Sequence, residues 1–347
     1  MRDRPSNHQV AQRAMALSWT ADAAFAASRF HEARKGYEQA LELHRRAEYR
    51  HGEGLVRINL GAVDLCQGRL EESRTHLEAA LAIHRKQGEG RFAALASGRL
   101  GALELEVGNL DRAAACFAVA HEVHQAAGER PYELAALLAI GMLHRAAGRL
   151  EEARVYLETT LREARAILDD RLQVAAIVEL GLLLQEEDRP ADAIVEMERA
   201  MALHRRLDDA YARAGVLRAR AGLQLELADT TAMREDAAHA QKLCDEVGDR
   251  HGLGEAVALI AVAEATSGRL DAARAHFEEA AARVADHPLL RVVVEVHRGH
   301  LDLAEGTAGR EAAAQRLAAA EEGEAPAAGR SAGVRIAARL LREAMAR

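Results

Sequence analysis

The chain has 347 residues, a formal net charge of −8, 3% aromatic residues and five prolines. The acidic balance, with acids and arginines interleaved along the chain, excludes a dominant electrostatic attraction to nucleic acid, which needs clustered basic residues. The scarcity of proline removes the main helix breaker and favours an all-helical chain with an aliphatic and alanine-rich core.

Residues 1–12 are polar and contain Pro5, which predicts a short flexible lead before the first helix, expected to begin near Ala11. This stretch lacks the apolar core of a signal peptide, and the longest apolar runs are shorter than the roughly 20 residues of a membrane span. The three cysteines, Cys66, Cys116 and Cys244, lack CxxC spacing. We therefore expect reduced thiols, a cytoplasmic location and no contact with a membrane.

Glycine recurs at twenty-residue intervals from Gly68 to Gly148, and Gly248 and Gly268 return to the same spacing. A glycine just after a helix can adopt the left-handed conformation that closes the helix. This spacing predicts forty-residue units, each with one helix of about 14 and one of about 17 residues. Because repeats stack into a continuous core, we expect one elongated domain over residues 13–306.

Small and large apolar residues alternate in these units at fixed positions. The first helices contain Leu60-Gly61, Leu100-Gly101, Ile140-Gly141 and Leu180-Gly181, and the second contain Ala33-Tyr37-Ala40, Ala113-Phe117-Ala120, Ala193-Met197-Ala200 and Ala273-Phe277-Ala280. This pattern resembles the tetratricopeptide repeat, with units like those of bacterial maltose-regulator-type and kinesin-light-chain-like arrays. It departs from the family in its forty-residue unit, where the standard repeat has 34 residues, and in lacking the usual terminal proline.

The resemblance implies an all-α fold, an α-solenoid of about seven helix pairs forming a right-handed superhelix with a C-terminal helical cap. The sixth pair is irregular, since Gly222 comes one residue late and Thr230 or Thr231 is expected to cap its second helix. Pro288 is expected to start the next helix.

Residues 307–347 are expected to form a linker and capping helices. Ser331 can cap a last helix with an apolar stripe flanked by Arg335, Arg339 and Arg342. We interpret it as a cap over the last repeat. The alternative is a basic amphipathic helix that binds a partner or a membrane surface.

The resemblance also implies that the first helices line a concave groove. Polar residues two positions before and four positions after the small glycine would then face a bound peptide; they are Asn59, Arg99, Arg145, Glu179, Gln185, Arg220 and Glu226. Arginines at such positions can grip carboxylates of an extended peptide. The alternative is that these side chains are simply solvated.

Histidine recurs at His44, His84, His124 and His204, in the last turns of second helices, and Ala164 interrupts the series. We interpret this ladder as structural, with partly protonated rings that bond free carbonyls at the helix ends. The pairs His121/His124 and His297/His300 could hold a metal, but two imidazoles alone make a weak site. We therefore expect no metal.

Motifs of the GxxxxGK[ST], HExxH and GxSxG types are absent from the sequence. We expect no enzyme activity and no cofactor, although an enzyme using the histidines is a remaining alternative. The predicted function is a non-enzymatic scaffold that binds a protein or peptide in its groove. The alternative is a sensor or regulatory component of a bacterial signalling or transcription-control system that binds a small ligand or signal peptide. We expect a monomer or weak self-association through terminal repeats.

Overall fold

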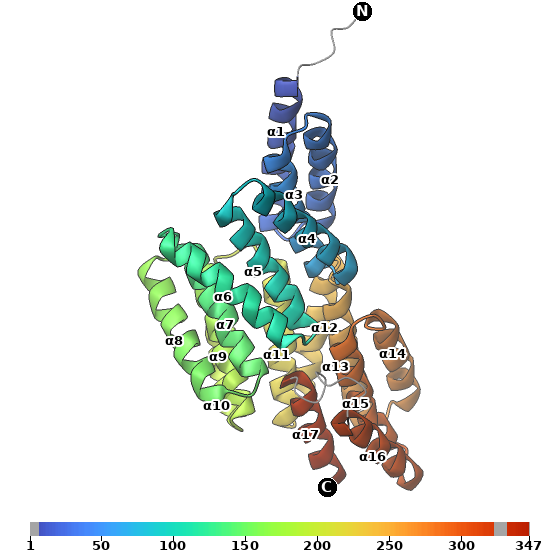
Figure 1. Ribbon diagram of the computed structural model, residues 1–347. Coiled ribbons are helices and arrows are strands. Elements are labelled where there is room, and N and C mark those ends of the chain that lie inside the picture. The colour runs from blue at the N-terminus through green and yellow to red at the C-terminus, as the bar shows by residue number, and fades with distance from the viewer. Residues whose placement is uncertain (1–6, 323–331, 347) are drawn as a thin grey trace, which may run out of the picture.

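The computed structural model describes residues 7–322 and 332–346, and within these ranges every regular element is an α-helix (Figure 1). The first nine helices are α1 (Asn7–Ala26), α2 (Phe30–Arg46), α3 (Arg50–Cys66), α4 (Leu70–Lys86), α5 (Gly90–Glu106), α6 (Leu110–Ala126), α7 (Arg130–Ala146), α8 (Leu150–Ala166) and α9 (Asp170–Glu186). The remaining helices are α10 (Pro190–His204), α11 (Ala210–Glu226), α12 (Thr230–Val247), α13 (Arg250–Thr266), α14 (Leu270–Arg283), α15 (Pro288–Ala304), α16 (Thr307–Glu322) and α17 (Ala332–Ala346).

Consecutive helices pack as antiparallel pairs, and successive pairs stack into the predicted α-solenoid. Helices α2 to α9 each span 17 residues. The predicted length of about 14 residues for one helix of each pair is therefore wrong. Helix α1 begins at Asn7, earlier than the expected start near Ala11.

Most of the connections are short, because one residue in each of these adopts the left-handed conformation. Gly68 has φ of 71°, its N–H donates to the Leu65 carbonyl, and the next N–H donates to the Asp64 carbonyl at 2.8 Å. This is the bonding that closes a helix with a left-handed residue. The same conformation recurs on the twenty-residue spacing where glycine is absent, at Ser28, Glu48, Leu168, Asp188 and Ala228.

The predicted small positions are close contacts between the two helices of a pair. A Cβ on Gly61 would lie 2.6 Å from Cγ of Leu77, and one on Gly101 would lie 2.7 Å from the Phe117 ring. Gly141 faces Leu157 in the same way. These glycines therefore let the two helix backbones approach closely, which confirms the packing implied by the repeat pattern.

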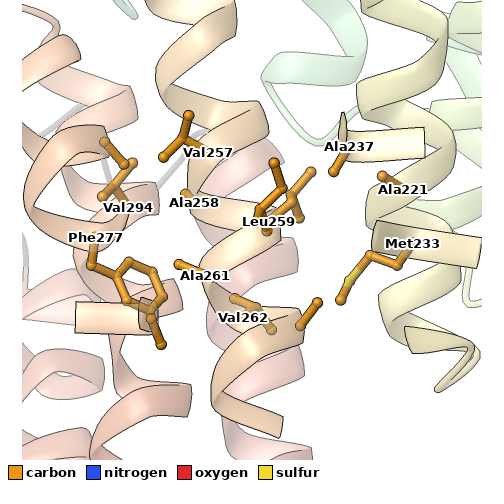
Figure 2. Close-up of a cluster of buried hydrophobic side chains, with 14 of the residues drawn as sticks. Ala221, Met233, Ala237, Val257, Ala258, Leu259, Ala261, Val262, Phe277 and Val294 are labelled. Carbon is orange, nitrogen blue, oxygen red and sulfur yellow. The ribbon is translucent and has the colours of Figure 1, made fainter. Parts of the chain in front are cut away.

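The largest buried cluster surrounds α13, which lies between α11, α12, α14 and α15. Figure 2 shows two opposite sides of this helix, with Leu259 on the side of Ala237 and Ala261 on the side of Phe277. A helix buried on all sides is apolar all round, which is why α13 lacks a clear amphipathic pattern.

Two predicted helix starts had different outcomes. The cap of α12 is Asp229, whose Oδ1 accepts from the Ala232 N–H at 3.0 Å, so the prediction of a Thr230 or Thr231 cap is wrong. Asp229 takes this role because its carboxylate reaches the free N–H groups three residues later. Pro288 starts α15 as predicted, and His287 caps it. Ser331 lies outside the described residues.

The first repeat contacts the α10–α11 connection and the start of α11, although these segments are far apart in the sequence. Ser28 Oγ donates to Asp209 Oδ1 at 3.0 Å, and the rings of Phe30 and Tyr211 meet edge to face with centroids 5.5 Å apart. Val247, at the end of α12, belongs to the same buried cluster. We call these five residues the seam, because they join segments far apart in the sequence.

The C-terminal helices extend and cover the stack. Helices α15 and α16 form a further pair, and α17 packs across both (Figure 1). Its Val334, Ala338 and Leu341 join a buried cluster with Val296 of α15 and Leu317 of α16. The apolar stripe of the last helix is thus the surface that caps the stack, as predicted.

Candidate binding cavity

A cavity of about 470 Å³ lies inside the solenoid. It is lined by first helices α5, α7, α9, α11, α13 and α15, and α17 contributes one wall. Apolar lining residues include Leu182, Val293, Ile336 and Leu340. The first helices do face a common interior space, which α17 partly fills.

Arg145 is the central cation of one side of the cavity. Its Nε donates to Glu179 at 2.9 Å and its Nη1 donates to Glu186 at 3.0 Å. Burial alone would lower the pKa of Arg145, but these two carboxylates hold that pKa above its ordinary value. The side chain is 13% exposed, so Arg145 is a paired and largely buried cation.

Arg218 forms a second ionic cluster on the α11 side. Its Nε donates to Glu255 at 3.0 Å and its Nη1 donates to Asp249 at 3.2 Å. Burial would lower the pKa of Arg218, whereas the carboxylates of Asp249 and Glu255 raise it above its ordinary value. The cavity therefore contains fixed charges of both signs on an apolar lining, an arrangement suited to orienting a ligand.

Two arginines of α17 bind to equivalent places on consecutive repeats. Arg335 pairs with Glu186 and also donates to the Ala146 carbonyl at 3.4 Å. Arg339 pairs with Glu226 and donates to the Gln185 carbonyl at 3.3 Å. Each guanidinium thus meets at least one carboxylate and one carbonyl near a helix C-terminus, both of which attract cations. Arg339 also pairs with Asp188 at 2.7 Å.

The carboxylates in these contacts share one repeat position, the last residue of a first helix. Glu186 ends α9, Glu226 ends α11 and Glu106 ends α5. Glu106 Oε1 lies 3.1 Å from His287 Nε2, and although burial raises the pKa of Glu106, bonding to His287 lowers it overall. The C-terminal part of the chain is therefore held against the cavity by a row of three carboxylates.

The structure brings four of the seven predicted groove residues together. Arg145, Glu179 and Gln185 line the cavity. Glu226 accepts from Gln185 Nε2 at 3.0 Å. These four contact one another or α17, so their exposure to a partner is less than the sequence suggested.

The other three predicted residues lie elsewhere. Asn59 donates to Asp22 at 3.0 Å, and Arg99 lines a separate cavity of about 310 Å³. Arg220 forms two hydrogen bonds with Asp236, at 2.6 and 2.7 Å, within its own helix pair.

The position of Arg220 has a simple physical reason. Helix α11 keeps the forty-residue spacing from α9, so the residue equivalent to Glu179 is Ala219, which lines the cavity. Counting from Gly222 shifted the prediction by one residue, which is about 100° around a helix. The small contact position of this pair is Ala221, which is fully buried, whereas a Cβ on Gly222 would meet nothing within 4 Å.

Arg218 and Glu255 line the cavity but were not predicted as site residues. Glu186, which pairs with Arg335 of α17, was not predicted either. A recurring glutamate at positions 106, 186 and 226 was a usable signal in the sequence. The arginines of α17 carried no such signal, because their partners lie more than a hundred residues away in the chain.

The histidine ladder is buried and packs between consecutive pairs. His124 Nδ1 lies 2.8 Å from the carboxylate of Glu129, the residue that caps the next helix. Burial lowers the pKa of His44, His124 and His204, so the expected partial protonation is wrong for these rings. At these three positions burial therefore favours the neutral form of the ring.

His297 and His300 lie on α15, and His297 lines the cavity. Their rings stack with centroids 6.2 Å apart, so ring faces rather than nitrogens confront each other. Burial lowers the pKa of His297 to about 3 and that of His300 to about 4. Both rings are therefore neutral at pH 7 and add no positive charge to the cavity.

Comparisons with known proteins agree with this architecture. The sequence model of the tetratricopeptide repeat matches residues 12–86 and 92–166. No curated protein sequence matches the chain. None of the described helices is long and apolar enough to cross a membrane.

Solved structures share the fold over most of the chain. A Rap protein complexed with competence and sporulation factor aligns with a TM-score of 0.65 at 14% identity, covering 97% of this chain and 99% of that chain. The Rap conjugation gene regulator of plasmid pLS20, in complex with the Phr* peptide, aligns with a TM-score of 0.65 at 13% identity, covering 92% and 97%. Aspartyl phosphate phosphatase F from Bacillus subtilis aligns with a TM-score of 0.56 at 12% identity, covering 85% and 76%. At these identities the likeness concerns the fold alone.

Proposed function

We propose that this chain, whose residues 12–86 and 92–166 match the tetratricopeptide repeat, is a non-enzymatic scaffold that binds a protein segment or peptide in the central cavity. The observation that carries this proposal is the cavity of about 470 Å³, with apolar walls and paired charges fixed on its lining. This size lies within the roughly 300–1,000 Å³ of typical ligand sites. Two proteins of the same fold are known in complex with competence and sporulation factor and with the Phr* peptide, which supports a peptide as the ligand.

The charges of the cavity favour recognition over catalysis. Arg145 and Arg218 are each bonded to two carboxylates, so neither is poised with a free partner for proton transfer. Such pairs can orient the backbone and polar side chains of a peptide, while Leu182 and Val293 accept its apolar side chains. Of the predicted groove residues, we retain Arg145, Glu179, Gln185 and Glu226 as the proposed contact surface.

A sensor or regulatory role is the second candidate, and the position of α17 favours it. Gly333, Ile336 and Leu340 of this helix line the same cavity, so a ligand there touches α17 directly. A ligand with different affinities for two positions of α17 would shift the equilibrium between them. In this role the protein would act in the cytoplasm on a separate effector chain, as a monomer or a weak self-associate.

The proposal is tested by filling the cavity. Gly222 lines it, and a Cβ there would meet nothing within 4 Å, so Gly222→Trp adds a large side chain at an open position of the cavity lining. Charge reversal of Arg145 is less informative, because it would place a third carboxylate beside the buried carboxylates of Glu179 and Glu186. Gly90→Trp is the matched control, since Gly90 is exposed and a Cβ there also meets nothing within 4 Å.

Native mass spectrometry of the protein incubated with the peptide fraction of the source organism identifies what is retained. We expect the wild type and Gly90→Trp to retain the same peptide and Gly222→Trp to bind it at least about tenfold more weakly, a difference of about 1.4 kcal/mol. Equal retention by Gly222→Trp, or no peptide retained by the wild type, would contradict the proposal.

A further inference from the structure

A cluster of potential metal ligands lies outside the cavity, where α3, α4 and α5 meet. Among the described residues, His51, His84 and Glu89 form a group whose ligand atoms all lie within 4.8 Å of one another. His51 is in the first turn of α3, His84 is in the last turn of α4, and Glu89 precedes α5 as its N-cap. Three segments of two consecutive repeats therefore contribute one ligand each.

The carboxylate of Glu89 bridges the two imidazoles. Its Oε1 lies 2.8 Å from His51 Nδ1, and its Oε2 lies 2.6 Å from His84 Nδ1. Both Nδ1 atoms thus point at one anionic group, which is the arrangement that a cation needs.

The cluster of His51, His84 and Glu89 packs against a phenylalanine on one side and is partly exposed to solvent on the other. Phe92 packs against both, with its centroid 4.8 Å from that of His51 and 5.4 Å from that of His84. His84 is fully buried, whereas the side chains of His51 and Glu89 are 25% and 26% exposed. An ion held here could keep a water molecule as a further ligand.

The next repeat contains the same cluster with one change. His124 and Glu129 occupy the places of His84 and Glu89, and their Nδ1 and Oε2 atoms are 2.8 Å apart. Tyr132 stacks on His124 where Phe92 packs on His84. Arg91, however, takes the place of His51 and forms an ion pair with Glu129. This repeat supplies a fixed cation where the earlier one supplies a second imidazole nitrogen.

We propose that His51, His84 and Glu89 form a zinc site. Two imidazoles and one carboxylate are a ligand set that zinc accepts, with a fourth position left for water. Binding would displace protons from the two Nδ1 atoms, and the ion would join the ends of three helices. This inference departs from the sequence-based expectation of no metal, and it does not depend on the proposed peptide binding.

The repeat itself supplies the variants for the test. His51→Arg copies the residue of the next repeat, so it should preserve the packing and remove one ligand. Arg91→His copies the earlier repeat and should create a second site. His121→Gln is the matched control, because it changes a histidine outside the cluster.

Tag-free protein, stripped with a chelator, is titrated with zinc chloride by calorimetry, and the bound metal is counted by elemental analysis. We expect one equivalent for the wild type and His121→Gln, none for His51→Arg, and two for Arg91→His. Zinc should also raise the Tm of the wild type but not that of His51→Arg. Circular dichroism checks that each variant is folded, and Glu89→Gln serves as a second loss variant.

Two results would overturn the proposal. One is a wild-type protein that binds no stoichiometric zinc. The other is unchanged zinc binding by both His51→Arg and Glu89→Gln, which would place the ion elsewhere. A count that stays at one in Arg91→His would also count against these three ligands as a sufficient set.

Discussion

The first and second halves of the array are built from the same unit but differ in regularity. Helices α2 to α9 all have 17 residues and share three-residue connections. In the second half α10 has 15 residues, α12 has 18 and α14 has 14. The departures affect second helices and the connections that follow them, whereas α11 and α13 keep the forty-residue spacing.

Each irregular connection contacts an earlier repeat. The one after α10 brings Asp209 to Ser28, and the one after α14 brings His287 to Glu106. At the end of α12, a Cβ on Gly248 would lie 2.9 Å from His31 Nε2. Irregularity in this chain therefore marks places where contacts across the superhelix are added to the contacts between neighbouring helices.

The largest expected effect comes from removing an aromatic ring from the seam. Phe30→Ala should lower the free energy of unfolding by about 3–5 kcal/mol, because the ring is buried against Tyr211. It should also increase the radius of gyration measured by small-angle X-ray scattering. Phe117→Ala removes an equally buried ring from a regular pair. Phe117→Ala should lower the free energy of unfolding, measured by urea denaturation, by a similar amount without changing the radius of gyration. Identical scattering by the two variants would contradict the special role of the seam.

A smaller effect is expected where α17 meets the repeats. The double substitution Arg335→Glu and Arg339→Glu places like charges beside Glu186 and Glu226, whose side chains are each 5% exposed. Because the arginines are partly exposed, we expect a cost of about 2 kcal/mol, below the roughly 3–5 kcal/mol of a broken, fully buried pair. Amide hydrogen exchange should therefore speed up roughly thirtyfold in α17 and remain unchanged in α2 to α6. Arg342→Gln, an exposed arginine of the same helix, should leave exchange unchanged. Unaltered exchange in the double variant would show that α17 is held by its apolar face alone.

The smallest effect concerns the helix connections of the regular half. Leu168 has φ of 57° and its side chain is exposed, so Leu168→Gly should stabilise the protein by about 0.5–1 kcal/mol. Gly148 has φ of 73° at the equivalent turn, and a Cβ there meets nothing within 4 Å. Gly148→Ala should therefore lower the Tm by the conformational cost alone. A lower Tm in Leu168→Gly would mean that the leucine side chain makes a contact that stabilises the protein by more than its left-handed backbone conformation costs.

Much of the fold could be predicted because the residues that pack the two helices of a repeat occupy the same positions in each repeat. Gly61, Gly101 and Gly141 predicted the close helix contacts, and the twenty-residue spacing of glycine predicted the turns. The same spacing continues at Leu168 and Asp188, where glycine is absent, because neighbouring repeats impose the geometry. Local periodicity was therefore sufficient for the architecture.

The cavity was only partly predictable, for two physical reasons. Arg145 and Glu179 were found because they follow the repeat spacing, whereas Arg220 was misplaced by counting from Gly222, which is one residue late. The arginines of α17 belong to no repeat. Their partners depend on how the C-terminal helices fold back, and no local pattern encodes this.

The seam has a consequence for how such a protein can evolve. An open solenoid can gain or lose a unit at little cost, because each unit contacts only its neighbours. Here Ser28 and Asp209 are 181 residues apart and must meet. One more unit between them would carry Asp209 a full step further along the stack and leave Phe30 without Tyr211. A duplication of one repeat within this stretch would therefore break the seam. Selection to keep the seam contacts constrains the number of repeats between α2 and α11.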